Sequence, residues 1–254
     1  SCVEITACGQ SGSWVFSPVI NTPAVLLEVM RDNPACADQT ELMAAFGQAL
    51  RARVLADMRT QMLWQLERSR NGGDNLLSSC LVRDCLQAGK SVDEGGATYN
   101  FIMPTFLGLA NVVDSLAAIK TLVFDENELT MAGFYQIVMD DFAGHEVLRE
   151  RILNRLPHFG NHEPVTDGLM QQVTELARAS CEGIVTLLGG RAIPGAYSYL
   201  EHVRKGQETP ATPDGRRAHT ALAAASSPVQ GCEVRGPTAA VLSATCWDQV
   251  PFMG

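Results

Sequence analysis

Residues 211–217 read Ala-Thr-Pro-Asp-Gly-Arg-Arg, and the chain continues with Ser-Pro-Val-Gln-Gly at 227–231 and Gly-Pro-Thr at 236–238. Proline and glycine at this density favour turns over helix or strand. The Asp-Gly-Arg sequence at 214–216 lacks the Gly-Lys-Ser/Thr ending with which a P-loop holds phosphate. We therefore expect a turn with a structural ion pair at this point in place of a phosphate site.

Helical patterns precede this block. The Thr-Pro pair at 22–23 is typical of an N-cap followed by proline at the first helical position, and it predicts a helix to about Asp32. Asp38 and Glu41 resemble a capping box. Behind them, apolar residues recur at helical spacing up to a Gly-Gly-Asp-Asn turn at 72–75, which predicts one long helix. The stripe consists of Leu42, Phe46, Leu50, Val54 and Met58.

The rest of the chain alternates between helical and strand-like patterns. Further helices are predicted over residues 76–87, 105–124, 130–142, 144–156 and 166–188. Strands are predicted over 97–103 and 196–203, a loop over 205–217, and an apolar stretch over 238–246. From Arg191 onward we expect strands and loops to dominate. Helices that alternate with short apolar strands favour an α/β architecture with parallel pairing.

Composition excludes several classes of protein. Of the 254 residues, 46% are hydrophobic and 19% are charged, which is typical of a well-cored globular chain. The net charge of −9 argues against nucleic acid or an anionic membrane surface as the partner. No apolar run approaches the roughly 20 residues of a membrane span. We expect neither a nucleic-acid nor a membrane partner.

The cysteines and histidines do not form a metal-binding pattern. The eight cysteines include no Cys-x2-Cys pair and are too sparse for a disulfide scaffold. His145, His158 and His162 have irregular spacing and polar neighbours, so surface or capping positions are expected for them. We expect no bound metal or cofactor, and a reducing, cytoplasmic setting.

Cys2 and Glu4 form the one pair near the amino terminus that suggests chemistry. In an extended segment, side chains two residues apart point to the same side, so the thiol and the carboxylate can face one cavity. A cysteine is more often a small buried hydrophobic residue than a catalytic one. The tetrapeptide by itself leaves both interpretations open.

Five blocks of sequence together resemble the glycyl radical enzymes of the pyruvate formate-lyase-like superfamily. Cys-Val-Glu at 2–4 is similar to the cysteine loop of their dehydratase and eliminase branch. The Gly-Gly-x-x-Tyr-Asn segment within 93–101, the helix sequence at 114–120, the Phe-Gly-Asn turn at 159–161 and the block at 211–217 follow in the family's order. These blocks extend over nearly the whole chain.

The resemblance implies a fold and a chemistry. The fold is a helix-rich ten-stranded α/β barrel with the cysteine loop at its centre, of which this chain would supply roughly the second half. A separate activating enzyme with S-adenosylmethionine and an iron–sulfur cluster installs a radical on a backbone glycine. Cys2 would then become the thiyl radical that abstracts hydrogen from a small-molecule substrate, and Glu4 would be the base that assists elimination. A homodimer of the full-length protein is also implied.

Three functions remain open at this point. Ser1 stands where pyruvate formate-lyase has the first cysteine of a Cys-Cys pair, and Glu4 is present, which favours elimination over acyl transfer. A pyruvate formate-lyase-type acyltransferase and an arylacetate decarboxylase are the enzymatic alternatives. A non-catalytic truncated product is the third. An Arg-Val-x-Gly-Tyr motif is absent from residues 1–254, so we expect a single partial domain, truncated at both ends and inactive alone.

Three residues are candidates for the substrate pocket. Trp14 and Phe16 fall where polyol dehydratases carry polar contacts, which implies a more apolar or bulkier pocket; an ordinary packed loop is the alternative. Asn100, in the Gly-Gly-x-x-Tyr-Asn segment, would line the mouth of the barrel. Capping of nearby backbone groups is the competing role of Asn100.

Overall fold

The computed structural model describes residues 6–11, 17–71 and 76–253. Cys2, Glu4, Trp14 and Phe16 lie outside these ranges. The helices are α1 (Thr22–Asp32), α2 (Gln39–Arg70), α3 (Leu76–Leu81), α4 (Cys85–Ala88), α5 (Leu109–Ile119), α6 (Met131–Met139), α7 (Glu146–Arg155), α8 (Pro164–Cys181), α9 (Glu201–Glu208) and α10 (Pro237–Ala244). A 3₁₀ turn η1 (Val92–Glu94) and a π-helical segment η2 (Lys120–Asp125) are also present. The strands are β1 (Val19–Asn21), β2 (Phe101–Ile102), β3 (Thr105–Leu107) and β4 (Arg191–Ala192).

Both predicted amino-terminal helices are present, and their caps explain where they begin. The Asn21 side chain accepts a hydrogen bond from the Ala24 amide at 3.3 Å, so Asn21 and not Thr22 caps α1. Thr22 lies in the first turn and donates its hydroxyl to the carbonyl of Leu107. Asp38 caps α2 by accepting from the Glu41 amide at 2.8 Å, as the sequence predicted.

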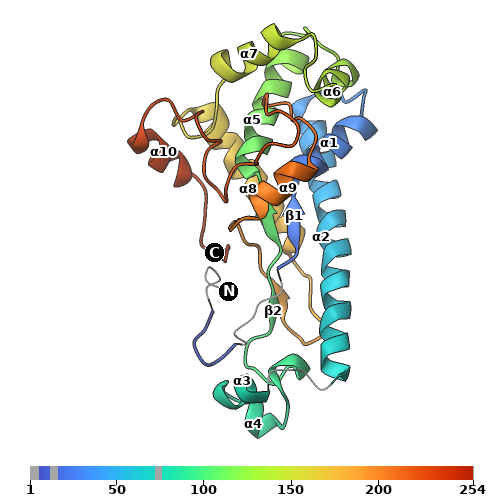
Figure 1. Cartoon of the computed structure of the whole chain (residues 1–254), viewed down its shortest axis with the longest axis vertical. Coiled ribbons are helices and arrows are strands. Elements are labelled where there is room, and N and C mark those ends of the chain that lie inside the picture. Colours follow the sequence, from blue (N-terminus) through green and yellow to red (C-terminus); the bar gives the residue numbers. More distant parts are fainter. Residues whose placement is uncertain (1–5, 12–16, 72–75, 254) are drawn as a thin grey trace.

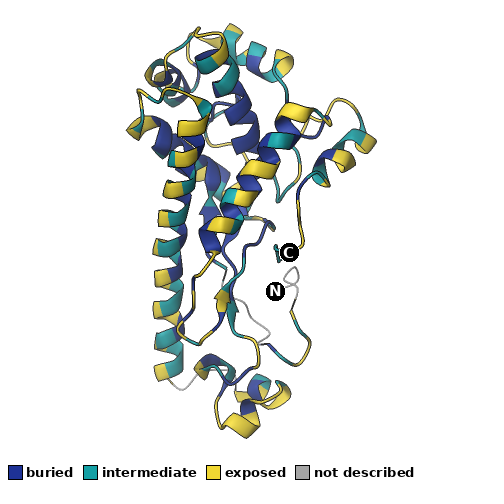
Figure 2. Ribbon diagram, turned by 180° about the vertical axis from the view of Figure 1, so that it is seen from behind, coloured by how far each residue is buried: buried dark blue, intermediate teal, exposed yellow. Residues whose placement is uncertain are grey.

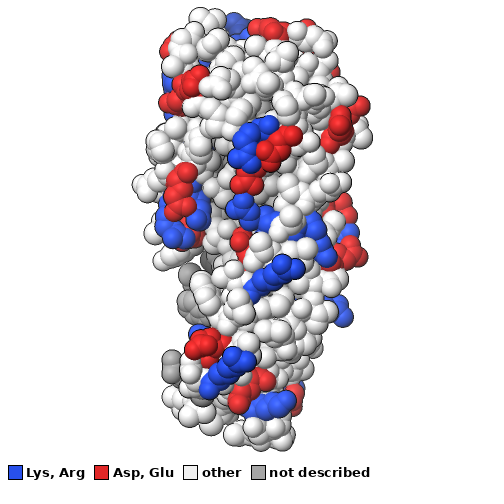
Figure 3. All heavy atoms as spheres, turned by 90° about the vertical axis from the view of Figure 1, so that its right-hand side faces the viewer, with Lys and Arg blue, Asp and Glu red and all other residues white. Residues whose placement is uncertain are grey.

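Helix α2 runs along one side of the molecule, from the level of α1 down to the region of α3 and α4, and so joins two regions (Figure 1). Its apolar stripe is buried from Leu42 to Met58, against α1 and α8. Beyond Met58 only Gln65 is buried, and Leu63 and Trp64 are exposed. The second half of the helix therefore leaves the main core and reaches the small region formed by α3, α4 and η1. On the side of the molecule where α2 lies, basic and acidic groups are interspersed (Figure 3).

Three parallel segments form the sheet structure. Strand β1 pairs with β3 in the register Val19 to Thr105, and β2 pairs with β4 in the register Phe101 to Arg191. An isolated parallel bridge joins Thr105 to Gly195, which keeps the register of the β2 and β4 pair. Residues 101–107 thus lie between residues 19–21 and residues 191–195.

Helix α5 is the centre of the core. All of its eleven residues are buried, and it contacts α1 and α8 (Figure 2). The helix begins after Gly108, whose φ of 71° is left-handed and whose Cβ, if present, would lie 2.7 Å from Pro23. Glycine is therefore required where β3 turns into α5 against the start of α1.

The predicted helix over 105–124 was wrong at its start. Residues 105–107 form β3, because Gly108 ends the strand and an apolar run alone does not separate a buried strand from a buried helix. The predicted helix over 76–87 is divided into α3 and α4, with Asp84 between them at a φ of 74°. The predicted helix over 166–188 runs instead from Pro164 to Cys181.

The prediction for the carboxyl-terminal region was also wrong. The strand predicted over 196–203 does not form, since the paired residues are Arg191 and Ala192 with a further bridge at Gly195. Residues 201–208 form α9, so the first residues of the predicted loop over 205–217 are helical. Residues 237–244, which overlap the predicted apolar stretch, form α10. Aromatic and β-branched residues near 197–203 resembled a strand, but Glu201 and Arg204 pair at helical spacing at 2.9 Å.

We predict that Gly190→Ala destabilises the protein by more than about 3 kcal/mol. A Cβ at Gly190 would lie 1.1 Å from the carbonyl oxygen of Asn100, so the segments of β2 and β4 would have to separate. Gly168→Ala is the control: it lies in α8 with no atom within 4 Å of the new Cβ, and it should stabilise by about 0.5–1 kcal/mol. Urea unfolding of both variants measures the difference, and equal effects would contradict the close approach.

Candidate functional site

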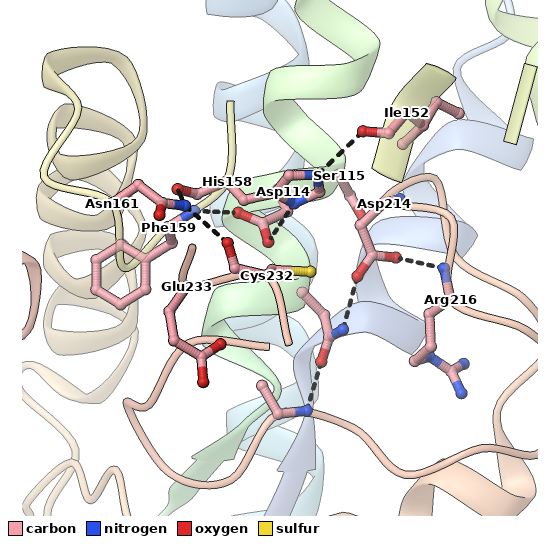
Figure 4. Close-up of polar contacts among 12 residues, drawn as sticks. Asp114, Ser115, Ile152, His158, Phe159, Asn161, Asp214, Arg216, Cys232 and Glu233 are labelled. Carbon is pink, nitrogen blue, oxygen red and sulfur yellow. Dashed lines mark hydrogen bonds and ion pairs between the residues drawn. The ribbon is translucent and has the colours of Figure 1, made fainter. Parts of the chain in front are cut away.

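Three polar side chains on α5 hold the Pro- and Gly-rich block of the sequence. The amide of Asn111 donates to Asp214 Oδ2 at 2.6 Å, and its oxygen accepts from the Ala223 amide at 2.7 Å. Ser115 Oγ accepts from the Asp214 amide at 3.2 Å. Asp114, which is on the same buried helix α5, faces residues 158–159 (Figure 4). The loop at 211–217 is therefore fixed to the core by hydrogen bonds to α5.

The turn predicted at 214–216 is present, but the ion pair predicted within it is not. The Arg216 guanidinium donates to Thr212 Oγ1 at 3.2 Å, to the Thr220 carbonyl at 2.7 Å and to the Pro210 carbonyl. The contact between Arg216 and Asp214 is from the backbone amide, at 3.4 Å. Burial lowers the pKa of the Arg216 guanidinium, because the charge is removed from water. The Arg216 guanidinium therefore holds the loop together by donating to several of its carbonyl oxygens.

His158 and Asp114 form a buried pair. Nδ1 of His158 lies 3.0 Å from Asp114 Oδ2, and Nε2 lies 3.0 Å from the Ile152 carbonyl oxygen. Asp114 Oδ1 accepts from the Phe159 amide at 2.7 Å. Both ring nitrogens face acceptors, so the ring is best satisfied when both carry a proton. The expected surface or capping position was wrong for His158, which is buried.

The pKa values of the two side chains agree with this geometry. Burial opposes the charge on His158, but the Asp114 carboxylate and the Cys232 side chain outweigh it and raise the pKa of the imidazole to about 11. Burial raises the pKa of the Asp114 carboxyl to about 6, against the hydrogen bond from His158. His158 therefore stays protonated, and Asp114 ionised, at neutral pH.

Asn161 connects the same region to the segment after residue 231. Its amide donates to the carbonyls of His158 at 3.1 Å and Cys232 at 2.8 Å. Its oxygen accepts from the amides of Val234 at 2.8 Å and Arg235 at 3.0 Å. One side chain thus satisfies four backbone groups, which suits the buried position of Asn161.

The described parts of the amino-terminal segment lie along residues 99–107. Ser11 forms a parallel bridge to Tyr99, whose amide donates to the Gln10 carbonyl at 3.0 Å. Further on, the Thr105 amide donates to the Pro18 carbonyl at 2.8 Å, and β1 follows. The segment that carries Cys2 and Glu4 in the sequence therefore leads into β1, which pairs with the central strand β3.

Asn100 has local contacts. Its side-chain amide donates to the carbonyls of Ala97 at 3.0 Å and Gly95 at 3.4 Å. The residue is half-buried. These bonds match the capping role considered from the sequence, and a contact of Asn100 with substrate stays a prediction.

Sequence reasoning missed the polar network on α5. The signal was available: Asn111, Asp114 and Ser115 interrupt a run of apolar residues at helical spacing. Buried polar groups need partners, so such an interruption predicts a buried network. Its partners, near residues 158 and 214, are far away in sequence and could not be assigned from the pattern alone.

Two further observations describe what the structure contains. In the described ranges, no helix is long and apolar enough to cross a membrane. No group of three or more His, Cys, Asp or Glu side chains arranged to hold a metal ion was found among the described residues. The described cysteines are free thiols.

Comparison with known structures defines the class of fold. The chain superposes with a TM-score of 0.93 on a structure that concerns 1,2-propanediol dehydration in Roseburia inulinivorans. The match covers 98% of this chain and 34% of that chain, with 29% sequence identity. The fold is thus part of the helix-rich α/β barrel of the glycyl radical enzymes, as the resemblance implied, and the chain covers about a third of the length of the compared protein.

Comparison of the sequence with known proteins leads to the same family. The pyruvate formate lyase-like family model matches residues 1–206, and the chain belongs to this family. It is 38% identical over 181 residues to the probable dehydratase YbiW of Escherichia coli, a match to 66% of this chain and 22% of the relative. It is 32% identical over 264 residues to (2S)-3-sulfopropanediol dehydratase of Klebsiella oxytoca, a match to 96% of this chain and 32% of the relative. The chain therefore spans about a fifth to a third of the curated relatives that it matches.

We predict that the free energy of unfolding falls as the pH rises from about 6.5 to 8.5, and that His158→Asn removes most of this slope. The unfolded histidine loses its proton near pH 6.5, while the folded one keeps it until about pH 11. The folded state then binds more protons, so stability decreases with pH by up to about 1.4 kcal/mol per unit. Urea unfolding at several pH values measures the slope. An identical slope in His158→Asn would show that the pair is not the source.

Proposed function

We propose that the full-length protein is a glycyl radical lyase of the dehydratase type, which eliminates water or a similar group from a small alcohol. The observation that carries this proposal is the family match, which includes the Cys-Val-Glu sequence at 2–4, together with two relatives named dehydratases. The compared structure concerns 1,2-propanediol and one relative a sulfonated propanediol, so a 1,2-diol is the substrate class that we infer.

Cys2 and Glu4 are the proposed catalytic residues. A glycyl radical, installed by an S-adenosylmethionine and iron–sulfur activating enzyme, supplies the means to remove hydrogen from the cysteine. Cys2 then takes a hydrogen atom from the substrate carbon and returns one to the product. Glu4 removes the proton of the neighbouring hydroxyl while the leaving group departs, and the spacing of two residues places it near the reacting carbon.

The proposed chemistry requires a neutral, protected thiol at Cys2. The described parts of the amino-terminal segment lie along residues 99–107, of which Met103, Thr105 and Leu107 are buried. An apolar, water-poor site raises the pKa of a thiol, and hydrogen-atom transfer needs the S–H form. Ser1 before Cys2 favours elimination over acyl transfer. A cytoplasmic homodimer with its activating enzyme completes the proposal.

We predict that Cys2→Ala abolishes turnover of 1,2-diols by the activated full-length protein and leaves the glycyl radical signal in place. Glu4→Gln should lower kcat by about 10²–10⁴-fold, which is the usual contribution of a general base. Anaerobic assays of aldehyde or ketone product and electron paramagnetic resonance provide the two measurements.

Cys8→Ala is the matched control, because Cys8 is a free, exposed thiol in the same segment. It should retain turnover. Full activity in Cys2→Ala would refute the thiyl role. Release of carbon dioxide from an arylacetate by the wild type, with no diol turnover, would favour the decarboxylase alternative.

A further inference from the structure

The small region formed by α3, α4 and η1 contacts the amino-terminal segment (Figure 1). The Arg83 amide, in the turn between α3 and α4, donates to the Gly9 carbonyl at 2.7 Å. The Tyr99 amide, a few residues after η1, donates to the Gln10 carbonyl at 3.0 Å, and Tyr99 also forms the parallel bridge to Ser11. This stretch of the amino-terminal segment is therefore held at two points by backbone hydrogen bonds.

A hydrogen bond between two side chains joins these two points. Thr98 Oγ1 donates to Asp84 Oδ2 at 2.7 Å. Asp84 follows Arg83 in the chain and Thr98 precedes Tyr99, so this bond fixes the spacing between the two backbone donors. The three hydrogen bonds form a closed set, which we call the anchor. Its residues are Gly9, Gln10, Arg83, Asp84, Thr98 and Tyr99.

Asp84 has a backbone conformation that is unfavourable for most residues. Its φ of 74° is left-handed, a region that aspartate tolerates and glycine prefers. Such conformations persist where the surrounding structure over-determines them, and they cluster at functional positions. The side chain of Asp84 makes no capping bond to α4, which begins directly after it. Glycine would fit this turn without strain, so what aspartate adds at the position is the acceptor for Thr98.

The anchored stretch is close in sequence to the proposed catalytic residues. Ala7 belongs to the same tight turn, since its carbonyl accepts from the Gln10 amide at 3.0 Å and from Ser11 Oγ at 3.2 Å. Ala7 follows Glu4 by three residues, which span at most about 11 Å when fully extended. The anchor therefore limits how far Glu4, and Cys2 two residues before it, can lie from Ala7.

We propose that Asp84 and Thr98 are positioning residues for the segment that carries Cys2 and Glu4. Their hydrogen bond keeps the two backbone donors of the anchor at a fixed spacing and so fixes the point from which this segment extends. A displacement of the thiol or the carboxylate by about 1 Å can slow the chemical step by about 100-fold, because the reacting atoms must be held near contact. This role rests on the proposed function and adds to it two residues that act through the backbone.

The test is turnover of propane-1,2-diol by the activated full-length protein. Thr98→Val removes the hydroxyl and keeps the shape of the side chain, so it should lower kcat by about 10–100-fold while KM stays within about twofold. Asp84→Gly keeps the left-handed turn and removes the acceptor, and it should cause a loss of the same size. The two changes together should cost no more than either alone, because both remove the same bond.

Two further variants separate positioning from a general effect on the structure. Thr98→Ser keeps the donor and should restore kcat to within about threefold of the wild type. Thr60→Val is the matched control, because Thr60 is an exposed threonine on α2 whose hydroxyl bonds the Ala56 carbonyl of the same helix, at 3.4 Å; it should retain turnover. Each kcat is referred to the glycyl radical content, measured by electron paramagnetic resonance. Unchanged kcat in Thr98→Val, or an equal loss in Thr98→Ser, would overturn the positioning role.

Amide hydrogen exchange of the intact, non-activated protein supplies an independent measurement. Thr98→Val and Asp84→Gly should speed exchange at the Arg83 and Tyr99 amides by about fivefold or more, and Thr60→Val should not. Unchanged exchange at both amides in Thr98→Val would overturn the positioning role, because the side-chain bond would then not hold the anchor.

These results can be separated from the fate of the proposed function. Exchange is measured before the radical is installed, so it does not depend on turnover. Faster exchange in Thr98→Val, combined with full turnover by Cys2→Ala, would confirm the anchor and refute the thiyl chemistry. Cys2-dependent turnover with an unchanged kcat in Thr98→Val would keep the thiyl chemistry and overturn the positioning role.

Discussion

The burial of α5 is the constraint on which the rest of the structure depends. A helix that is buried on every side can carry polar residues only if each of them finds a partner, because an unsatisfied buried group costs about as much as a typical mutation destabilises a protein. Asn111, Asp114 and Ser115 meet this requirement with groups from residues 158–159, 214 and 223. The Pro- and Gly-rich loop therefore has a fixed place, although it has little regular structure of its own.

The same helix connects the loop to the sheet. Gly108 turns β3 into α5 against Pro23, and Thr22 is bonded to the end of β3. Asn21, the cap of α1, donates to Thr209 Oγ1 at 2.8 Å, just before the loop. The carboxyl ends of β1 and β3 are thus joined to the loop through one short series of contacts. We therefore expect a change in the position of the loop to shift the carboxyl ends of β1 and β3.

Local signals in the sequence predicted the long helix α2 and the cap at Asp38, because both depend on residues within a few positions of each other. They did not separate β3 from α5, since burial on all sides removes the periodicity that distinguishes a strand from a helix. The family resemblance was confirmed. The partners of Asp114 and the orientation of Arg216 could not be derived, because they are set by contacts of residues far apart in the chain. The roles of Cys2, Glu4, Trp14 and Phe16 stay predictions.

The register of the parallel segments also has a consequence for synthesis on the ribosome. Val19 pairs with Thr105, and Thr105 in turn lies beside Gly195. Strand β1 leaves the ribosome long before either partner has been made, and at usual rates of translation the delay is on the order of ten seconds. Throughout that time the edge of β1 that pairs with β3 has no partner from the later part of this chain. Helices α1 and α2 follow β1 directly and share a core with Ile20, so they are the first elements of this chain available to cover it.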